Sequence, residues 1–123
     1  MSSRVVAVVD DDASVRRGLA RLLRSADFQV HTYASAADFL ATGISSTPDC
    51  LILDIHFGGM SGLELLSRLR NLGYTLPVLI ITAHDHAQAR EAAARGGCAA
   101  YLRKPVNAKV LLEEVATALN RAS

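Results

Sequence analysis

A chain of 123 residues fits one domain, and a chain of this size buries about two thirds of its unfolded surface in a single core. Half of its residues are hydrophobic, yet no apolar run approaches the roughly 20 residues of a membrane-spanning helix. The formal net charge of +1 gives no support for direct nucleic-acid binding, so we expect a single domain over residues 1–123 with neither membrane nor nucleic acid as partner.

The N-terminal residues and the cysteines indicate the compartment. The N-terminus lacks the charged and apolar regions of a signal peptide, so we expect a cytoplasmic protein. Cys50 and Cys98 each stand at the start of an apolar run. Thiols in such settings are typical of small core side chains, and we expect neither a disulfide nor a metal pair.

Apolar runs typical of strands alternate with amphipathic segments typical of helices. In chain order, strands are predicted at Arg4–Val9, Phe28–Tyr33, Cys50–Leu53, Leu76–Ile81 and Ala99–Arg103. Three helices have clear apolar stripes, formed by Val15, Leu19, Leu22 and Leu23, then Leu63, Leu65, Leu66 and Leu69, and finally Leu111, Leu112, Val115 and Leu119. Two shorter helices are predicted at Ser35–Ala41 and around His86–Arg95. This alternation predicts an α/β fold, with a parallel five-stranded sheet covered by helices on both faces.

Cap residues support these boundaries. Ser61-Gly62-Leu63-Glu64 has the spacing of a capping box, which begins a helix by satisfying its free backbone N–H groups. Asn107 is suited to cap the last helix. A left-handed glycine often ends a helix, and such glycines are predicted at Gly43, Gly73 and Gly96.

Polar side chains stand where four of the predicted strands end. Asp10–Asp12 follow the first strand, Asp54 the third, Thr82 the fourth and Lys104 the fifth. Ligands of doubly wound sheets bind at the carboxyl ends of the strands, near the point where strand order reverses. We therefore expect three carboxylates to converge there, where they repel one another unless a cation lies between them.

This set of side chains suits a divalent ion and phosphoryl chemistry. Asp10, Asp11 and Asp54 offer the hard oxygen ligands that Mg²⁺ prefers. A carboxylate can also attack phosphorus and form an acyl phosphate. Lys104 could neutralise one phosphoryl oxygen, and the Thr82 hydroxyl could donate a hydrogen bond to another.

The motifs Val8-Val9-Asp10-Asp11-Asp12, Leu53-Asp54, Met60-Ser61-Gly62, Thr82-Ala83 and Lys104-Pro105 carry a family resemblance. In order and spacing, over essentially the whole chain, they resemble the receiver domain of two-component response regulators. The residues of these motifs are most similar to those of receivers that precede a LuxR-type DNA-binding domain. The resemblance implies a (βα)₅ flavodoxin-like fold and a signalling domain, not an enzyme, that accepts phosphate from a histidine kinase or a histidine phosphotransfer protein.

Carried over by position, the resemblance implies a role for each site residue. Asp54 resembles the phosphoacceptor, Lys104 the phosphate-binding lysine, and Thr82 with Tyr101 the switch pair. Asp11 resembles a direct ligand of Mg²⁺ (or Mn²⁺), Asp10 a ligand that acts through water, and His56 a ligand through its backbone carbonyl. The resemblance also implies a cis Lys104-Pro105 peptide. It further implies an output surface on the fourth helix, fifth strand and fifth helix, which could serve a downstream partner, a missing output domain or a phosphorylation-dependent dimer.

Some positions depart from the family pattern or stand outside it. Gly58 stands where the family usually carries proline, and Phe57 where it often carries methionine or leucine, so we expect a more flexible loop after Asp54. His56 and His84 each lie two residues after a site residue, and we expect them to tune dephosphorylation at the rim. Together with Asp85 and His86 they could also suggest a transition-metal site, although solvated histidines are the favoured interpretation.

Two other functional classes remain as alternatives. A phosphorylation-independent interaction domain would normally have lost an acceptor or switch residue, whereas Asp54, Thr82 and Lys104 are all present. An Asp-nucleophile phosphatase of the haloacid-dehalogenase type expects a second Asp two residues after the first, where this chain has His56. The sequence leaves open whether the chain is a stand-alone receiver or part of a longer regulator.

Overall fold

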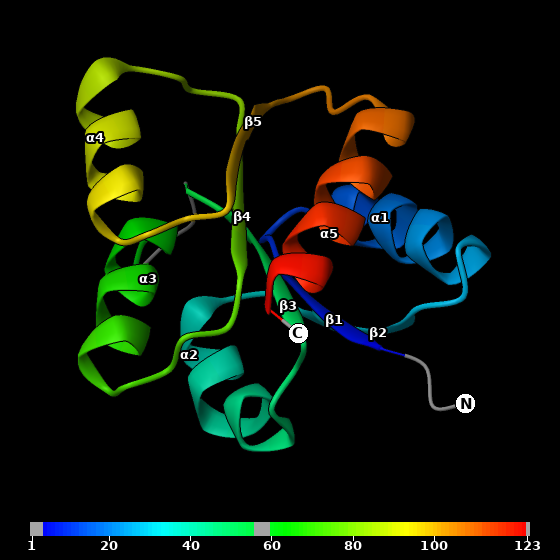
Figure 1. The fold of residues 1–123 in the computed structure, drawn as a ribbon, viewed down its shortest axis with the longest axis horizontal. Coiled ribbons are helices and arrows are strands. Elements are labelled where there is room, and N and C mark those ends of the chain that lie inside the picture. The colour runs from blue at the N-terminus through cyan, green and yellow to red at the C-terminus, as the bar shows by residue number, and fades with distance from the viewer. Residues whose placement is uncertain (1–3, 56–59, 123) are drawn as a thin grey trace.

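The computed structural model describes residues 4–55 and 60–122. Five parallel strands form one sheet in the order β2-β1-β3-β4-β5, with helices on both faces (Figure 1). The strands are β1 (Val5–Val9), β2 (Gln29–Tyr33), β3 (Cys50–Asp54), β4 (Val78–Thr82) and β5 (Ala100–Arg103). The helices are α1 (Ala13–Ser25), α2 (Ala36–Asp38), α3 (Gly62–Asn71), α4 (Ala87–Arg95) and α5 (Ala108–Ala122). The predicted doubly wound α/β fold is confirmed.

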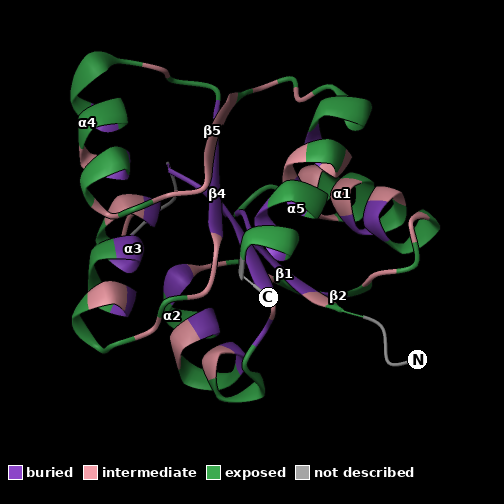
Figure 2. Cartoon of the chain, in the orientation of Figure 1, coloured by how far each residue is buried: buried purple, intermediate pink, exposed green. Residues whose placement is uncertain are grey.

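Each face of the sheet has its own hydrophobic core. Helices α1 and α5 cover one face and contribute Leu23 and Leu111 to its core, whereas α2, α3 and α4 cover the other, with Phe39 and Leu65 beneath them (Figure 1). The central strands β1, β3 and β4 send alternate side chains into the two cores and are almost wholly buried (Figure 2). Burial on both faces explains why these strands are continuous apolar runs in the sequence.

Two strands extend one residue further than the sequence predicts. Asp54 is the last residue of β3 and pairs in register with Ile81, and Thr82 is the last residue of β4 and pairs with Arg103. Because both polar residues belong to ladders, their backbones are held by neighbouring strands. The sheet therefore fixes the position from which each side chain leaves.

Two predicted helix caps are confirmed. The Ser61 hydroxyl accepts a hydrogen bond from the Glu64 backbone N–H at 3.1 Å, and the Asn107 side chain accepts one from Val110 at 3.1 Å. Each cap satisfies an N–H group that has no partner inside its helix. Both helices therefore begin where the sequence indicates.

The second helix and two glycine caps differ from the predictions. Helix α2 continues into a π-helical turn at Phe39–Gly43 and a 3₁₀ turn at Ile44–Ser46. Gly43 has a φ of −79° and lies against aromatic rings that leave no room for a Cβ. Gly96 also has a negative φ, and the left-handed residue is its neighbour Gly97. Only Gly73 adopts the predicted left-handed conformation, at φ 92°.

The two cysteines lie in or beside the sheet, and neither forms a disulfide. Cys50 is buried in β3 and Cys98 is half-buried before β5, and both thiols are free. Burial raises the pKa of Cys50 to about 12. Within the described ranges, no helix is both long and apolar enough to cross a membrane.

Candidate functional site

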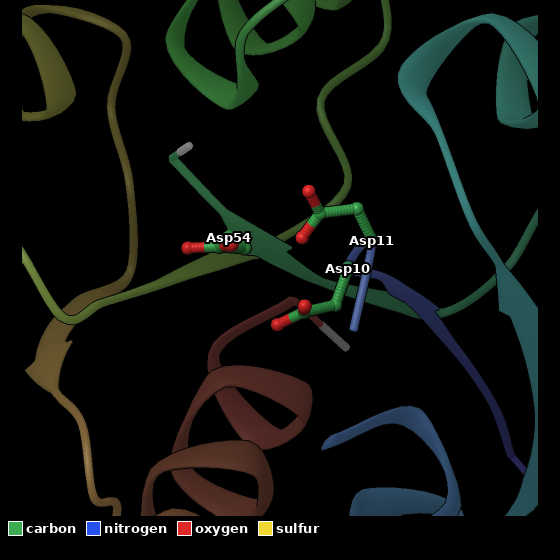
Figure 3. A group of neighbouring side chains, drawn as sticks. All are labelled: Asp10, Asp11 and Asp54. Atoms are coloured by element: carbon green, nitrogen blue, oxygen red, sulfur yellow. The ribbon is translucent and has the colours of Figure 1, made fainter. Parts of the chain in front are cut away.

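The polar residues at the strand ends meet at one edge of the sheet. Strands β1 and β3 are parallel neighbours with Val9 beside Leu53, so Asp10 and Asp54 follow side by side. Figure 3 shows their carboxylates gathered with that of Asp11, and one oxygen from each of the three lies within 4.8 Å of the others. Residues 4–55 and 60–122 contain no other group of three acidic, histidine or cysteine side chains so close together.

Asp10 is completely buried, and both of its carboxylate oxygens and its backbone carbonyl accept hydrogen bonds. Its Oδ1 accepts a hydrogen bond from the Asp12 backbone at 2.9 Å, and its Oδ2 accepts one from Lys104 Nζ at 2.9 Å. The Arg16 guanidinium donates to the Asp10 backbone carbonyl at 2.7 Å. Asp10 is therefore held in one orientation, and Arg16 is a contributor that sequence reasoning missed.

Lys104 is the counter-charge within the acidic group. Its amine lies 2.9 Å from Asp10 Oδ2 and 3.5 Å from Asp54 Oδ2. Burial by itself would lower the pKa of Lys104, but the hydrogen bond to Asp10 and the charge of Asp54 outweigh it and raise the pKa. The amine therefore stays charged between the two carboxylates. The predicted cis peptide between Lys104 and Pro105 is confirmed.

Asp11 and Asp12 are adjacent but have different tasks. Asp11 is exposed and belongs to the acidic group. Asp12 is the N-cap of α1, and its carboxylate accepts hydrogen bonds from Ser14 N at 2.8 Å and Val15 N at 3.3 Å. Asp12 therefore begins the helix as its cap and is not part of the acidic group.

Thr82 is fully buried and anchors two segments. Its hydroxyl accepts a hydrogen bond from His84 N at 2.9 Å, and its carbonyl accepts one from Lys104 N at 2.8 Å. The first contact fixes the loop that leads to α4, and the second ties β4 to the segment after β5. A rearrangement of the Thr82 side chain would therefore reach the loop before α4, while the backbone bond keeps β4 tied to the segment after β5.

The backbone beside Asp54 requires a glycine that sequence reasoning did not identify as part of the site. Gly62 donates its N–H to the Ile55 carbonyl at 3.0 Å. A Cβ on Gly62 would lie inside the van der Waals distance of the Asp54 carbonyl oxygen. The sequence marks Gly62 as the second residue of a capping box, a signal that does not reveal this close approach.

Tyr101 in β5 has neighbours that sequence reasoning also missed. The Arg90 guanidinium carbon lies 5.0 Å from the centroid of the Tyr101 ring. Arg90 also forms two hydrogen bonds to Asp85, at 2.8 and 2.6 Å. Burial raises the pKa of Tyr101, and the nearby Asp85 carboxylate raises it further. These contacts join residues 85, 90 and 101, a spacing with no signature in sequence.

Of the three histidines considered for the site, two belong to the part of the chain that the structure describes. His56 lies outside the described residues, as do Phe57 and the two glycines after it. His84 is exposed and is tied to Thr82 through its backbone N–H. His86 caps α4, with its Nδ1 accepting a hydrogen bond from Ala89 at 3.2 Å. Because His86 and Asp85 are both engaged in other contacts, the suggested transition-metal site has no support among the described residues.

The acidic group fits a small, hard divalent cation. Asp10, Asp11 and Asp54 supply carboxylate oxygens only, which is the donor chemistry that Mg²⁺ favours. Two of the three carboxylates are buried, and the single positive charge of Lys104 leaves the group negative. The residues present could therefore hold a divalent ion.

Comparison with known proteins agrees with this geometry. The family model of the response regulator receiver domain matches residues 6–116. The chain is 41% identical over 122 residues to the transcriptional regulatory protein TdiR of Thauera aromatica, covering 98% of this chain and 54% of that protein. It thus spans about half the length of the curated relatives it matches.

Solved structures have the same fold. A CheY-like receiver domain protein from Methanospirillum hungatei superposes with a TM-score of 0.93 at 26% identity, covering 98% of this chain and 96% of that one. A receiver protein from Burkholderia phymatum superposes with a TM-score of 0.83 at 45% identity, covering 96% of both chains. The chain therefore belongs to the receiver-domain family of two-component response regulators, whose general property is phosphorylation on an aspartate.

Proposed function

We propose that this receiver accepts a phosphoryl group on Asp54 and thereby changes the surface formed by α4, β5 and α5. The observation that carries the proposal is the position of the Lys104 amine, which contacts Asp10 and Asp54 at once. Asp54 leaves the end of β3 beside two further carboxylates, with the Thr82 hydroxyl at the end of the adjacent strand. This is the set of groups that phosphoryl transfer to a carboxylate needs.

The chemistry follows from these groups. A carboxylate oxygen of Asp54 attacks the phosphorus of a phosphohistidine, the phosphorus–nitrogen bond breaks, and the histidine takes up a proton. Lys104 then neutralises a phosphoryl oxygen, and the Thr82 O–H donates to another once its side chain turns from the His84 backbone. Mg²⁺, when held by Asp10, Asp11, Asp54 and the His56 carbonyl, supplies further charge neutralisation.

The proposed donor is a histidine kinase or a histidine phosphotransfer protein. The domain then acts as a cytoplasmic signalling switch whose phosphorylation and dephosphorylation are self-catalysed, and it is not a turnover enzyme. Its signal passes to a downstream protein, to an output domain of a longer regulator or to a second copy of the chain. The regulator TdiR, of which this chain matches about half, supports the second of these possibilities.

Labelling with a small phosphodonor tests the acceptor. The chain is incubated with acetyl phosphate and Mg²⁺, and its intact mass is measured. We expect one phosphoryl adduct, its loss in Asp54→Asn, and its loss when a chelator removes Mg²⁺. An adduct that persists in Asp54→Asn would disprove the assignment, and turnover of many phosphate esters would instead indicate a phosphatase.

We further propose that His56 and His84 set the lifetime of the phosphorylated state. The backbone bond from His84 to Thr82 supports a rim position for the exposed imidazole. An imidazole there can orient or exclude the attacking water. In His56→Ala and His84→Ala, labelling should survive while the decay of phospho-Asp54 changes several-fold, about 1 kcal/mol in the barrier. Unaltered decay in both variants would make the two histidines bystanders.

A further inference from the structure

The Tyr101 ring is turned into the molecule. It packs against the core that contains Ala89 and Ala93 of α4. Its hydroxyl oxygen is buried and makes no well-formed hydrogen bond among the described residues, although the Asp85 carboxylate lies near it. A buried hydroxyl without a partner disfavours the conformation that buries it. Other contacts must therefore stabilise the inward ring.

Arg90 supplies such a contact from the solvent side. Its guanidinium carbon lies 5.0 Å from the centroid of the Tyr101 ring, which is within the range of a cation–π interaction. The Arg90 side chain is 54% exposed, so it covers the ring at the surface without being part of the core. An outward movement of the ring would break this contact.

Asp85 fixes the orientation of Arg90. Asp85 Oδ1 accepts from Arg90 Nε at 2.8 Å, and Asp85 Oδ2 accepts from the terminal nitrogen at 2.6 Å. Two parallel hydrogen bonds orient a guanidinium more strictly than one bond does. The Arg103 Nε lies 3.8 Å from the same carboxylate and adds a second positive charge.

We propose that Arg90 is a positioning residue for Tyr101, which it holds inward through its contact with Asp85. Asp85 lies three residues after Thr82, in the loop that the Thr82 hydroxyl anchors through His84. The Asp85–Arg90 pair thus joins that loop to the ring on β5. This inference rests on the proposed function where it couples Tyr101 to the phosphoryl group.

The orientation of Tyr101 can be measured without phosphate. The chain is labelled with 3-fluorotyrosine, and ¹⁹F relaxation by a dissolved gadolinium chelate reports how exposed each ring is, with Tyr33 and Tyr74 as internal references. Loss of the stack in Arg90→Gln should raise the outward population of Tyr101 about fivefold, as expected for a contact of this class. Unchanged relaxation of Tyr101 in Arg90→Gln would overturn the proposal.

Arg95→Gln is the matched control. Arg95 is on the same helix, its side chain is 73% exposed, and it faces Glu91 at 4.0 Å. This variant should leave Tyr101 unchanged, and a single cooperative urea transition in both variants should show that both stay folded. Equal effects of the two variants would assign the change to helix charge and overturn the role of Arg90.

The part played by Asp85 is tested by non-additivity. In this mechanism Asp85→Asn releases Tyr101 by freeing Arg90, so the double variant with Arg90→Gln should match Arg90→Gln alone. Arg90→Lys keeps the charge but lacks the two parallel N–H groups, and it should restore only part of the inward population. Additive effects in the double variant would overturn the Asp85–Arg90 mechanism.

Binding of a phosphoryl analogue separates this inference from the proposed function. With beryllium trifluoride and Mg²⁺, the affinity of Arg90→Gln should fall in proportion to its loss of inward Tyr101, while Arg95→Gln should bind as the parent does. Equal affinities in Arg90→Gln and the parent would overturn the coupling. Failure of the parent to be labelled on Asp54 would overturn the proposed function, while the relaxation result would still decide the position of Tyr101.

Discussion

The adjacent residues Asp11 and Asp12 have different physical roles. The Asp11 carboxylate lies with those of Asp10 and Asp54, whereas Asp12 satisfies two backbone N–H groups at the start of α1. The first should matter only when a cation is present, because its own charge repels Asp10 and Asp54 otherwise. The second should matter with or without a cation.

Two alanine variants should separate these roles. Asp11→Ala should weaken Mg²⁺ binding while leaving the metal-free stability unchanged or higher. Asp12→Ala should lower the free energy of unfolding by about 1 kcal/mol through loss of the cap, with little change in Mg²⁺ affinity. Mg²⁺ titration and urea unfolding of both variants measure the two quantities. Equal losses of Mg²⁺ affinity would contradict the assignment of Asp11 as a direct ligand.

Gly62 and Gly18 form a second contrasting pair. In Gly62→Ala the new methyl meets the Asp54 carbonyl, and since backbone cannot yield cheaply we expect a loss of about 3 kcal/mol in unfolding free energy. Gly18 lies in the middle of α1, and no atom lies within 4 Å of the position that a Cβ would take there. Gly18→Ala should therefore raise stability by about 0.5–1 kcal/mol, as in exposed helix interiors. Urea unfolding that ranks the two variants the other way would refute the packing argument.

The roles of some site residues can be predicted from sequence, and those of others cannot. Asp10, Asp54, Thr82 and Lys104 follow apolar runs, and parallel sheets bring strand ends together, so their convergence was predictable. The close approach of Gly62 to Asp54 depends on how the loop between them returns, which no local pattern encodes. The contact of Arg90 with Tyr101 likewise depends on how α4 lies over β5.

Helix α4 is the element with the least side-chain anchorage. Its buried residues are Ala89 and Ala93, whereas α5 buries Leu111 and Val115 beside two further apolar residues. Small side chains contribute little apolar area, so the free energy that holds α4 in place is correspondingly small. The helix should open and shift more readily than α5.

Amide exchange should show this difference directly. Without ligand, the amides of α4 should exchange faster than those of α5. With a phosphoryl analogue and Mg²⁺, the largest change in protection should fall between His84 and Arg103, because Thr82 anchors the loop leading to α4. A change confined to α1 would contradict the proposed output surface.

The second helix shows why element boundaries are harder to predict than elements. The sequence predicts a regular helix that ends at a left-handed Gly43, but the chain passes through π and 3₁₀ turns, and Thr47 is left-handed instead. Gly43 is needed there because Phe39 and Tyr33 pack against it. That tertiary contact overrides the local helix signal.

For the whole molecule, we expect the site formed by the three carboxylates and Lys104 to trade stability against metal binding. Lys104 offsets carboxylate repulsion in the metal-free protein, since its amine contacts both Asp10 and Asp54. The same amine competes with a cation for these oxygens. Removing it should therefore move metal-free stability and Mg²⁺ affinity in opposite directions.

Lys104→Met tests this trade. We expect a loss of about 2 kcal/mol in the unfolding free energy of the metal-free chain, because Asp10 is left buried with its charge unpaired. We also expect tighter Mg²⁺ binding and a larger rise in thermal midpoint on Mg²⁺ addition. Lys109→Met, at an exposed position of α5, is the control and should change neither quantity. Weaker Mg²⁺ binding in Lys104→Met would show that the amine organises the site instead of competing for it.

Interior strands and edge strands of the sheet place different limits on which residues can change. The carboxylates and Thr82 leave the interior strands β1, β3 and β4, where almost every substitution disturbs packing on two faces. Tyr101 stands on the edge strand β5, and Arg90 and Asp85 lie near the surface beside it. Under the proposed function, gene duplicates can therefore exchange residues on the α4–β5 face, and with them their partners, while inheriting the same acceptor chemistry. Insulation between parallel signalling pathways then requires only surface mutations.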